Sequence, residues 1–104
     1  MPIQASSELL EGVIIALLDE KDLYGYVLTR EVQEIIDVSE SSVYPVLRRL
    51  TKEEYLLTYD EPYQGRNRRY YQVTEAGKFR LEIIKREWEQ YKKKIDGVFE
   101  NGYD

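Results

Sequence analysis

The sequence predicts a mainly α-helical fold with one β-hairpin, an α+β architecture in which three helices precede the hairpin and a long helix follows it. Apolar residues recur at helical spacing in three segments before residue 55. The period then shortens in two runs, at about residues 56–59 and 69–73, whose aromatic and β-branched residues are typical of strands. This order is that of a winged helix-turn-helix followed by a long C-terminal helix, and the length fits one compact domain.

The first three helices are expected at about residues 7–19, 24–36 and 39–54. Ser6 or Ser7 can cap the first helix, which is apolar nearly all round and is therefore buried, against its own core or against another chain. The second helix turns an apolar stripe that includes Ile35 towards the core. Pro45 is tolerated only close to a helix start, so the third helix begins near Ser41 or is distorted there.

The hairpin is expected to have a long basic loop over residues 60–68, because this stretch contains the turn-forming residues Pro62, Gly65 and Asn67. Thr74 then caps a last helix of about 25 residues, roughly 37 Å long. Its first turns, with Ala76 and Phe79, can pack on the domain's own core.

Composition excludes several classes of function. The chain contains neither cysteine nor histidine, which removes disulfides, thiolate metal sites and the commonest general base. We expect no metal, no cofactor and no enzymatic activity. The N-terminal residues do not resemble a signal peptide and no apolar run is long enough to span a bilayer, so a cytoplasmic location and no membrane contact are expected.

The net charge of −5 hides an uneven distribution. Residues 1–40 contain two basic and nine acidic residues, a balance of −7. Residues 41–80 contain eight basic and five acidic residues, a balance of +3, and the remainder is at −1. Positive charge therefore gathers in the third helix and the hairpin, where contact with a polyanion is expected.

The third helix and the hairpin together predict binding to double-stranded DNA. The second helix of a helix-turn-helix enters the major groove, and serine, tyrosine and arginine side chains there bond to phosphates or base edges. Three arginines around a glycine turn suit a wing on the phosphate backbone, whereas a charged edge that only prevents aggregation needs no single sign. Ser39 taken alone fits a helix cap better than a DNA contact. The candidate DNA-binding residues are Ser39, Ser41, Ser42, Tyr44, Arg48, Arg49, Arg66, Asn67, Arg68 and Arg69.

The last helix predicts a homodimer. Its apolar residues follow a spacing of 4, 3, 4, 3, the pattern of a coiled-coil seam, and the later turns lie too far along to be covered by the domain's own core. Residues 1–74 are thus expected to form the DNA-binding unit and residues 75–104 the dimerisation helix. The candidate interface residues, with those of the first helix, are Leu10, Val13, Ile14, Leu17, Ile84, Trp88, Tyr91, Ile95 and Val98.

The sequence resembles the PadR family of transcriptional regulators, within it the compact LmrR-like subfamily with a single C-terminal helix. The segments that match, in order and spacing, are residues 23–28 (LYGYVL), 42–50 (SVYPVLRRL), 65–71 (GRNRRYY) and 73–77 (VTEAG). One departure is that Glu54 and Tyr55 stand where a glycine usually precedes the first wing strand, which predicts a different turn.

The resemblance implies a homodimeric repressor of a palindromic operator, released by a small planar aromatic effector at the dimer centre. Trp88 falls at the position of a tryptophan that stacks on such ligands, and the flanking Lys85 and Lys92 would disfavour a cationic guest. The candidate ligand contacts are Val13, Leu81, Lys85, Trp88 and Lys92. The alternative is a winged-helix module that binds proteins instead of DNA, which the overall acidity favours and the basic wing opposes.

Overall fold

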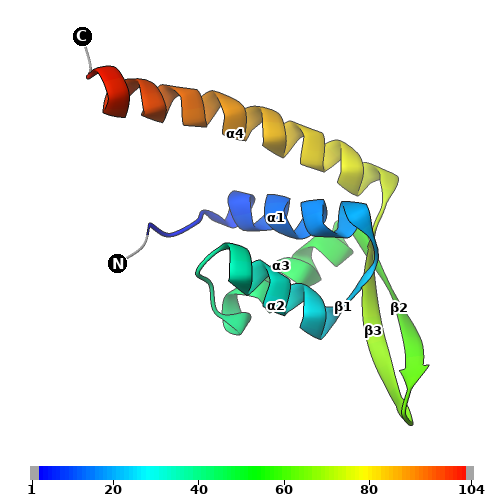
Figure 1. Ribbon diagram of the computed structural model, residues 1–104. Coiled ribbons are helices and arrows are strands. Elements are labelled where there is room, and N and C mark those ends of the chain that lie inside the picture. The colour runs from blue at the N-terminus through cyan, green and yellow to red at the C-terminus, as the bar shows by residue number, and fades with distance from the viewer. Residues whose placement is uncertain (1–2, 103–104) are drawn as a thin grey trace.

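The fold is the expected winged helix-turn-helix with a long C-terminal helix (Figure 1). The computed structural model describes residues 3–102, so the outermost residues of the two predicted units, 1–2 and 103–104, lie outside it. The elements in chain order are α1 (Ser7–Glu20), β1 (Leu23–Tyr24), α2 (Gly25–Ile35), α3 (Glu40–Lys52), β2 (Leu56–Tyr63), β3 (Arg66–Val73) and α4 (Glu75–Asn101).

Two predicted helix caps are confirmed. The Ser6 side chain accepts a hydrogen bond from the backbone N–H of Leu9 at 3.2 Å, and the Thr74 side chain accepts one from Gly77 at 3.0 Å. Each satisfies a backbone donor that the first turn of a helix leaves without an intrahelical partner. The caps fix where α1 and α4 begin.

Helix α1 lies at the centre of the protein, with α4 along one side of it and α2 and α3 on the other (Figure 1). Ile14 and Ile15 of α1 are fully buried, together with Leu28 of α2 and with Leu47 and Leu50 of α3. The apolar character of α1 all round is therefore explained largely by its own protomer.

The hairpin is longer and its turn shorter than predicted, so the expected loop over residues 60–68 is wrong. Strands β2 and β3 pair as far as Tyr63 and Arg66, and only Gln64 and Gly65 connect them. Both connecting residues have positive φ, 49° and 76°, as in the two-residue turn that matches the twist of a hairpin. Pro62 is accommodated because β2 is an edge strand, where one backbone donor fewer costs no ladder bond.

No residue pattern predicts the short strand β1, which pairs with β3 through Leu23 and Tyr24. Two residues are too few to show a strand period. The pairing places β3 in the middle of a three-stranded sheet and ties the start of α2 to the base of the wing.

Helix α3 begins at Glu40 and continues through Pro45, as expected for a start near Ser41. Because proline has no N–H, the carbonyl of Ser41 receives no backbone hydrogen bond four residues on. Pro45 is exposed, so this carbonyl lies on the outer side of the helix and can be satisfied by solvent.

The turn after α3 keeps a glycine-like geometry without a glycine. Glu54 has a φ of 65°, in the left-handed region. The N–H of Tyr55 donates to the carbonyl of Leu50 at 2.9 Å, and the N–H of Glu54 donates to the carbonyl of Thr51 at 3.1 Å. This pair of bonds is a Schellman motif, whose left-handed position usually holds glycine. The prediction of a different turn was therefore wrong, and Glu54 adopts the conformation at a steric cost.

Two apolar residues expected in the core are exposed. Ile35 is 55% exposed and Phe79 is 71% exposed, while Gly77, Leu81 and Ile84 form the face of α4 that packs inward. Ala76 is exposed as well. The chain has a radius of gyration of 15.9 Å, where about 13 Å is typical of a compact domain of this length, because α4 and the wing project from the core.

Candidate nucleic-acid interface

Three serine hydroxyls gather at the start of α3. The Ser39 hydroxyl lies 2.9 Å from that of Ser41 and 3.1 Å from that of Ser42, and all three residues are exposed. Ser39 occupies the cap position, but its side chain makes no capping bond to the helix, so the expected side-chain cap is wrong. The hydroxyls instead form a polar cluster that can exchange its mutual hydrogen bonds for bonds to phosphate oxygens.

Ser41, Tyr44 and Arg48 share one face of α3, because positions i, i+3 and i+7 lie above one another on a helix. Ser41 and Arg48 are exposed, whereas Tyr44 is half-buried against the core. The packed ring holds the tyrosine in place beside the arginine. The structure thus brings together three of the predicted DNA contacts on one outward face.

Arg49 is set apart from that face by about 100°, one residue along the helix. Its guanidinium lies 2.7 Å from the carboxylate of Glu53 and 3.7 Å from that of Glu11 in α1. The hydrogen bond with Glu53 is the largest cause that raises the pKa of Arg49. Arg49 therefore has protein partners, whereas Arg48 forms no ion pair with the residues between 3 and 102.

Wing arginines lie on both faces of the hairpin. Arg68 points to the same face as Tyr24 and Tyr63, and its guanidinium carbon is 4.7 Å and 3.6 Å from the centres of their rings. Arg69 points to the other face and pairs with Asp60 at 3.6 Å. Arg66 and Asn67, beside the turn, are exposed to solvent.

The face of the hairpin that contains Arg68 is a row of tyrosines. The rings of Tyr59 and Tyr70 stack at 5.6 Å, and Tyr70 contacts Tyr24 at 6.0 Å. Tyr59 donates a 2.6 Å hydrogen bond to Asp22, which together with burial raises the pKa of Tyr59 to about 12. These contacts link rings of β1, β2 and β3 along one face of the sheet.

Tyr71 occupies the opposite face, because successive residues of a strand point to opposite sides of the sheet. It packs against the core, and burial raises the pKa of its phenol. The positive charges of Arg69 and Arg48 act in the opposite direction on that pKa. The inner face of the wing thus meets the Arg48 side of α3.

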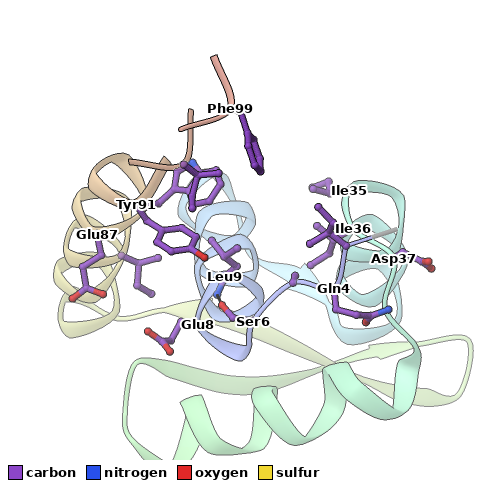
Figure 2. A pocket seen from close by; sticks show the side chains of 15 residues that line it. Gln4, Ser6, Glu8, Leu9, Ile35, Ile36, Asp37, Glu87, Tyr91 and Phe99 are labelled. Carbon is purple, nitrogen blue, oxygen red and sulfur yellow. Dashed lines mark hydrogen bonds between the residues drawn. The ribbon is translucent and has the colours of Figure 1, made fainter. Parts of the chain in front are cut away.

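A second feature is an apolar groove on the far side of α1 from α3, between the C-terminal half of α4 and the end of α2 (Figure 2). Tyr91 and Phe99 stand on one wall, Ile35 and Ile36 on the other, and Leu9 lies between them (Figure 2). The volume is about 990 Å³. An exposed apolar surface of this extent is typical of an interaction site.

The groove collects part of the predicted dimer interface and one predicted ligand contact. Ile84, Trp88, Tyr91 and Ile95 line it. Val98 is exposed nearby on α4 without lining it. The remaining interface candidates face their own core: Leu10 and Ile14 are buried, and Val13 and Leu17 pack against them.

The predicted ligand contacts do not meet in one pocket of the protomer. Only Trp88 lines the groove, while Leu81 is buried in the core. Lys85 pairs with Glu82 at 3.2 Å, and Lys92 pairs with Glu89 at 3.3 Å. Sequence reasoning missed Leu9, Ile35 and Phe99 as groove residues, because their helical periodicity does not distinguish the protein core from an unpartnered surface.

None of the helices described for residues 3–102 is long and apolar enough to cross a membrane. Over the same residues, no group of three acidic side chains is arranged to hold a metal ion.

Comparison with known proteins gives a consistent result. Residues 14–83 match the family described as "Transcriptional regulator PadR-like family". A protein of Lysinibacillus sphaericus called "Uncharacterized protein X" is 34% identical over 92 residues, which cover 84% of each chain.

Solved structures agree with the same fold. The crystal structure of smu.1704 from Streptococcus mutans UA159 superposes with a TM-score of 0.89 at 38% identity, over 100% of this chain and 98% of that one. A PadR-like transcriptional regulator from Bacillus cereus gives a TM-score of 0.79 at 29% identity, over 89% and 93%. A PadR family regulator from Clostridium difficile R20291 gives 0.74 at 32% identity, over 86% and 96%.

Proposed function

Because the chain belongs to the PadR-like family of transcriptional regulators, we propose that it is a repressor that binds a palindromic DNA operator as a homodimer. The observation that carries this proposal is one face of α3, which Ser41 of the serine cluster shares with Tyr44 and Arg48. Hydroxyls and a guanidinium at the start of a helix suit the phosphates and base edges of a major groove. The PadR-like family is one of transcriptional regulators rather than enzymes.

In the proposed complex, α3 lies in the major groove and each wing follows the flanking backbone. Arg66 and Asn67 directly follow the turn at the end of the hairpin, which projects from the core (Figure 1). Arg68 and Arg69 on the two faces of the strand present positive charge to either side. Phosphate contacts of this kind fix position and supply affinity, and α3 supplies the sequence preference.

A second copy of the chain is the proposed occupant of the apolar groove. The groove walls come from α4, α2 and the start of α1, so one further helix can cover all three. Charge supports this assignment, because Glu8, Asp37 and Glu87 line the groove while α4 has three consecutive lysines, Lys92 to Lys94. A two-fold axis would place the basic part of each α4 near the acidic rim of its partner.

Binding to DNA can be tested with a duplex obtained by selection from a random library. The parent is expected to bind a palindrome whose half-sites are about one helical turn apart. With at least six phosphate contacts in the dimer, its affinity should fall about 10³-fold between 50 and 200 mM salt. A parent that prefers no duplex over random DNA would refute the proposal and favour a protein-binding module.

Variants on the proposed surface sharpen this test. Arg66→Ala should weaken binding to all sequences and lower the salt slope of the dimer by about 2, one contact from each protomer, whereas Tyr44→Phe should cost on the order of 1 kcal/mol of binding per protomer. Arg86→Ala is the matched control, because Arg86 is an exposed arginine on α4. Equal affinities for parent, Arg66→Ala and Tyr44→Phe would refute the assigned surface.

We also propose that a planar aromatic effector binds beside Trp88 in the dimer. Trp88 is 42% exposed on the groove wall, and an indole face there can stack on a flat guest. It is the only tryptophan, so its fluorescence reports this place alone. Emission that no planar aromatic compound changes would remove the effector from the proposal and leave the dimer intact.

A further inference from the structure

One charged side chain is buried inside the protein, and DNA contact does not account for it. Among the residues that the structure describes, Glu11 is the only charged side chain in the core, with 2% of its surface exposed. Removing a carboxylate from water is costly unless it is paired and hydrogen-bonded. The residues that pair with Glu11 therefore indicate the structural role of its buried charge.

Glu11 binds arginines from two other helices. Arg80 of α4 grips it with a two-pronged contact, in which Nε donates to Oε1 and Nη2 donates to Oε2, each at 3.2 Å. The Nη1 atom of Arg49 in α3 lies 3.7 Å from the same Oε1 and 2.7 Å from Oε1 of Glu53. The four groups are neutral together, which compensates the buried charge.

The cluster joins two helices that α1 keeps apart. Helix α1 packs against both α3 and α4 and lies between them (Figure 1). The contacts of α3 with the core are otherwise apolar, through Val43, Val46, Leu47 and Leu50. Apolar contact is non-directional, whereas the forked Arg80–Glu11 contact orients α4 on α1, and the 3.7 Å ion pair of Arg49 links α3 to the same carboxylate.

We propose that Glu11 is a positioning residue for DNA binding, which holds α3 and α4 at one fixed angle through Arg49 and Arg80. The proposal rests on the function proposed above, because α4 is the helix through which two copies would meet and α3 is the helix that would enter the groove. With the angle fixed in each protomer, the dimer presents its two α3 helices at one separation. Arg49 accordingly acts inside the protein instead of on the DNA.

The first test measures the angle without DNA. The chain has no cysteine, so Lys52→Cys on α3 and Arg86→Cys on α4 allow two spin labels to be attached, and an excess of unlabelled chain leaves one labelled protomer per dimer. Pulsed electron resonance should give a narrow distance distribution in the parent background and a broader one after Glu11→Gln. Glu53→Gln is the matched control, because Glu53 caps the end of α3 and pairs with Arg49 of the same helix. The loss of this pair should leave the width of the distance distribution unchanged. A distribution as narrow in Glu11→Gln as in the parent would overturn the proposal.

The second test measures half-site spacing. The parent should discriminate between its selected palindrome and one lengthened by a base pair, and Glu11→Gln should reduce that ratio by at least about fivefold, the lower end of couplings between distant sites. Glu11→Met serves where the amide variant folds poorly, since apolar replacements of buried ions are often tolerated. Unchanged spacing preference in a folded Glu11 variant would contradict the proposal. If the parent binds no selected duplex, the proposed function fails, and the distance measurement still decides the role of Glu11.

Discussion

Replacing Glu54 by glycine should stabilise the protein, because Glu54 adopts a conformation that suits glycine better. Its φ of 65° places the Cβ of an L-residue close to the following carbonyl. Such left-handed geometry costs about 1–2 kcal/mol for a residue other than glycine. The gain is reduced by the greater freedom of glycine in the unfolded chain, by roughly 0.5–1 kcal/mol. The net expectation is a stabilisation of about 0.5–1 kcal/mol.

The contacts of the turn are backbone contacts and survive the substitution. The Schellman bonds use the N–H groups of Glu54 and Tyr55, and Thr74 donates to the carbonyl of Glu54 at 2.7 Å. Thermal unfolding at a fixed protomer concentration should show a melting temperature higher by about 2–6 °C.

Glu53→Gly is a stringent control for this prediction. Glu53 is the preceding residue and has the same side chain, but its φ is −80°, where glycine gives no steric relief. It also pairs with Arg49 at 2.7 Å. Glycine at Glu53 should therefore destabilise the protein while glycine at Glu54 stabilises it. If both variants were destabilised alike, the strain at Glu54 would be refuted.

Substitutions at Gly77, Tyr59 and Trp88 provide three further tests. Gly77→Ala should destabilise the fold by about 1–3 kcal/mol in chemical denaturation, since a Cβ there would collide with the backbone carbonyl of Tyr55. A stability equal to that of the parent would contradict this close approach. The pKa of Tyr59 is raised from 10 to about 12, so the neutral phenol should stabilise the fold below pH 10, and this stabilisation should be lost as the pH rises towards 12. The loss of unfolding free energy caused by Tyr59→Phe should therefore become smaller over that range. A loss that stays constant with pH would exclude a contribution from the ionisation of Tyr59. Trp88→Ala should weaken the proposed dimer by about 2 kcal/mol or more in sedimentation experiments. Phe79→Ala should not weaken it, because Phe79 is an exposed aromatic residue that does not line the groove. If both variants dimerised equally well, the interface would not lie at the groove.

Most of the fold was predictable because helices and caps leave local signals. The apolar period located all four helices to within about two residues, and Ser6 and Thr74 marked two of their starts. The wing was misjudged for a physical reason: Pro62 and Asn67 resemble turn residues, yet an edge strand tolerates both. The two-residue turn at Gln64 and Gly65 depends on positive φ values that no residue pattern specifies alone.

The candidate site was predictable in composition but not in arrangement. Residue types and charge indicated α3 and the wing as the DNA-binding surface. Whether Arg48 or Arg49 is free for DNA depends on which side of the helix faces α1. Arg49 differs from the adjacent Arg48 because it pairs with Glu53 four residues on and because Glu11 of α1 lies 3.7 Å from its guanidinium, and only the first of these partners is visible in the sequence. The exposure of Ile35 has a similar cause, because an apolar stripe fits a partner surface as well as a core.

The arrangement of α4 suggests how operator spacing would be set in a dimer. Its first half is held tightly: a Cβ on Gly12 of α1 would come within 2.8 Å of Ile84, and Arg80 is anchored by Glu11. Its second half projects from the core and carries the exposed Trp88 and Tyr91. In the proposed dimer, a helix that is fixed at its base and apolar along its projecting part would transmit the angle at which two such helices cross to the α3 helices proposed to face DNA. Substitutions along the outer half of α4 should therefore shift the preferred half-site spacing without touching DNA, whereas substitutions in the wing should alter affinity and leave the spacing unchanged.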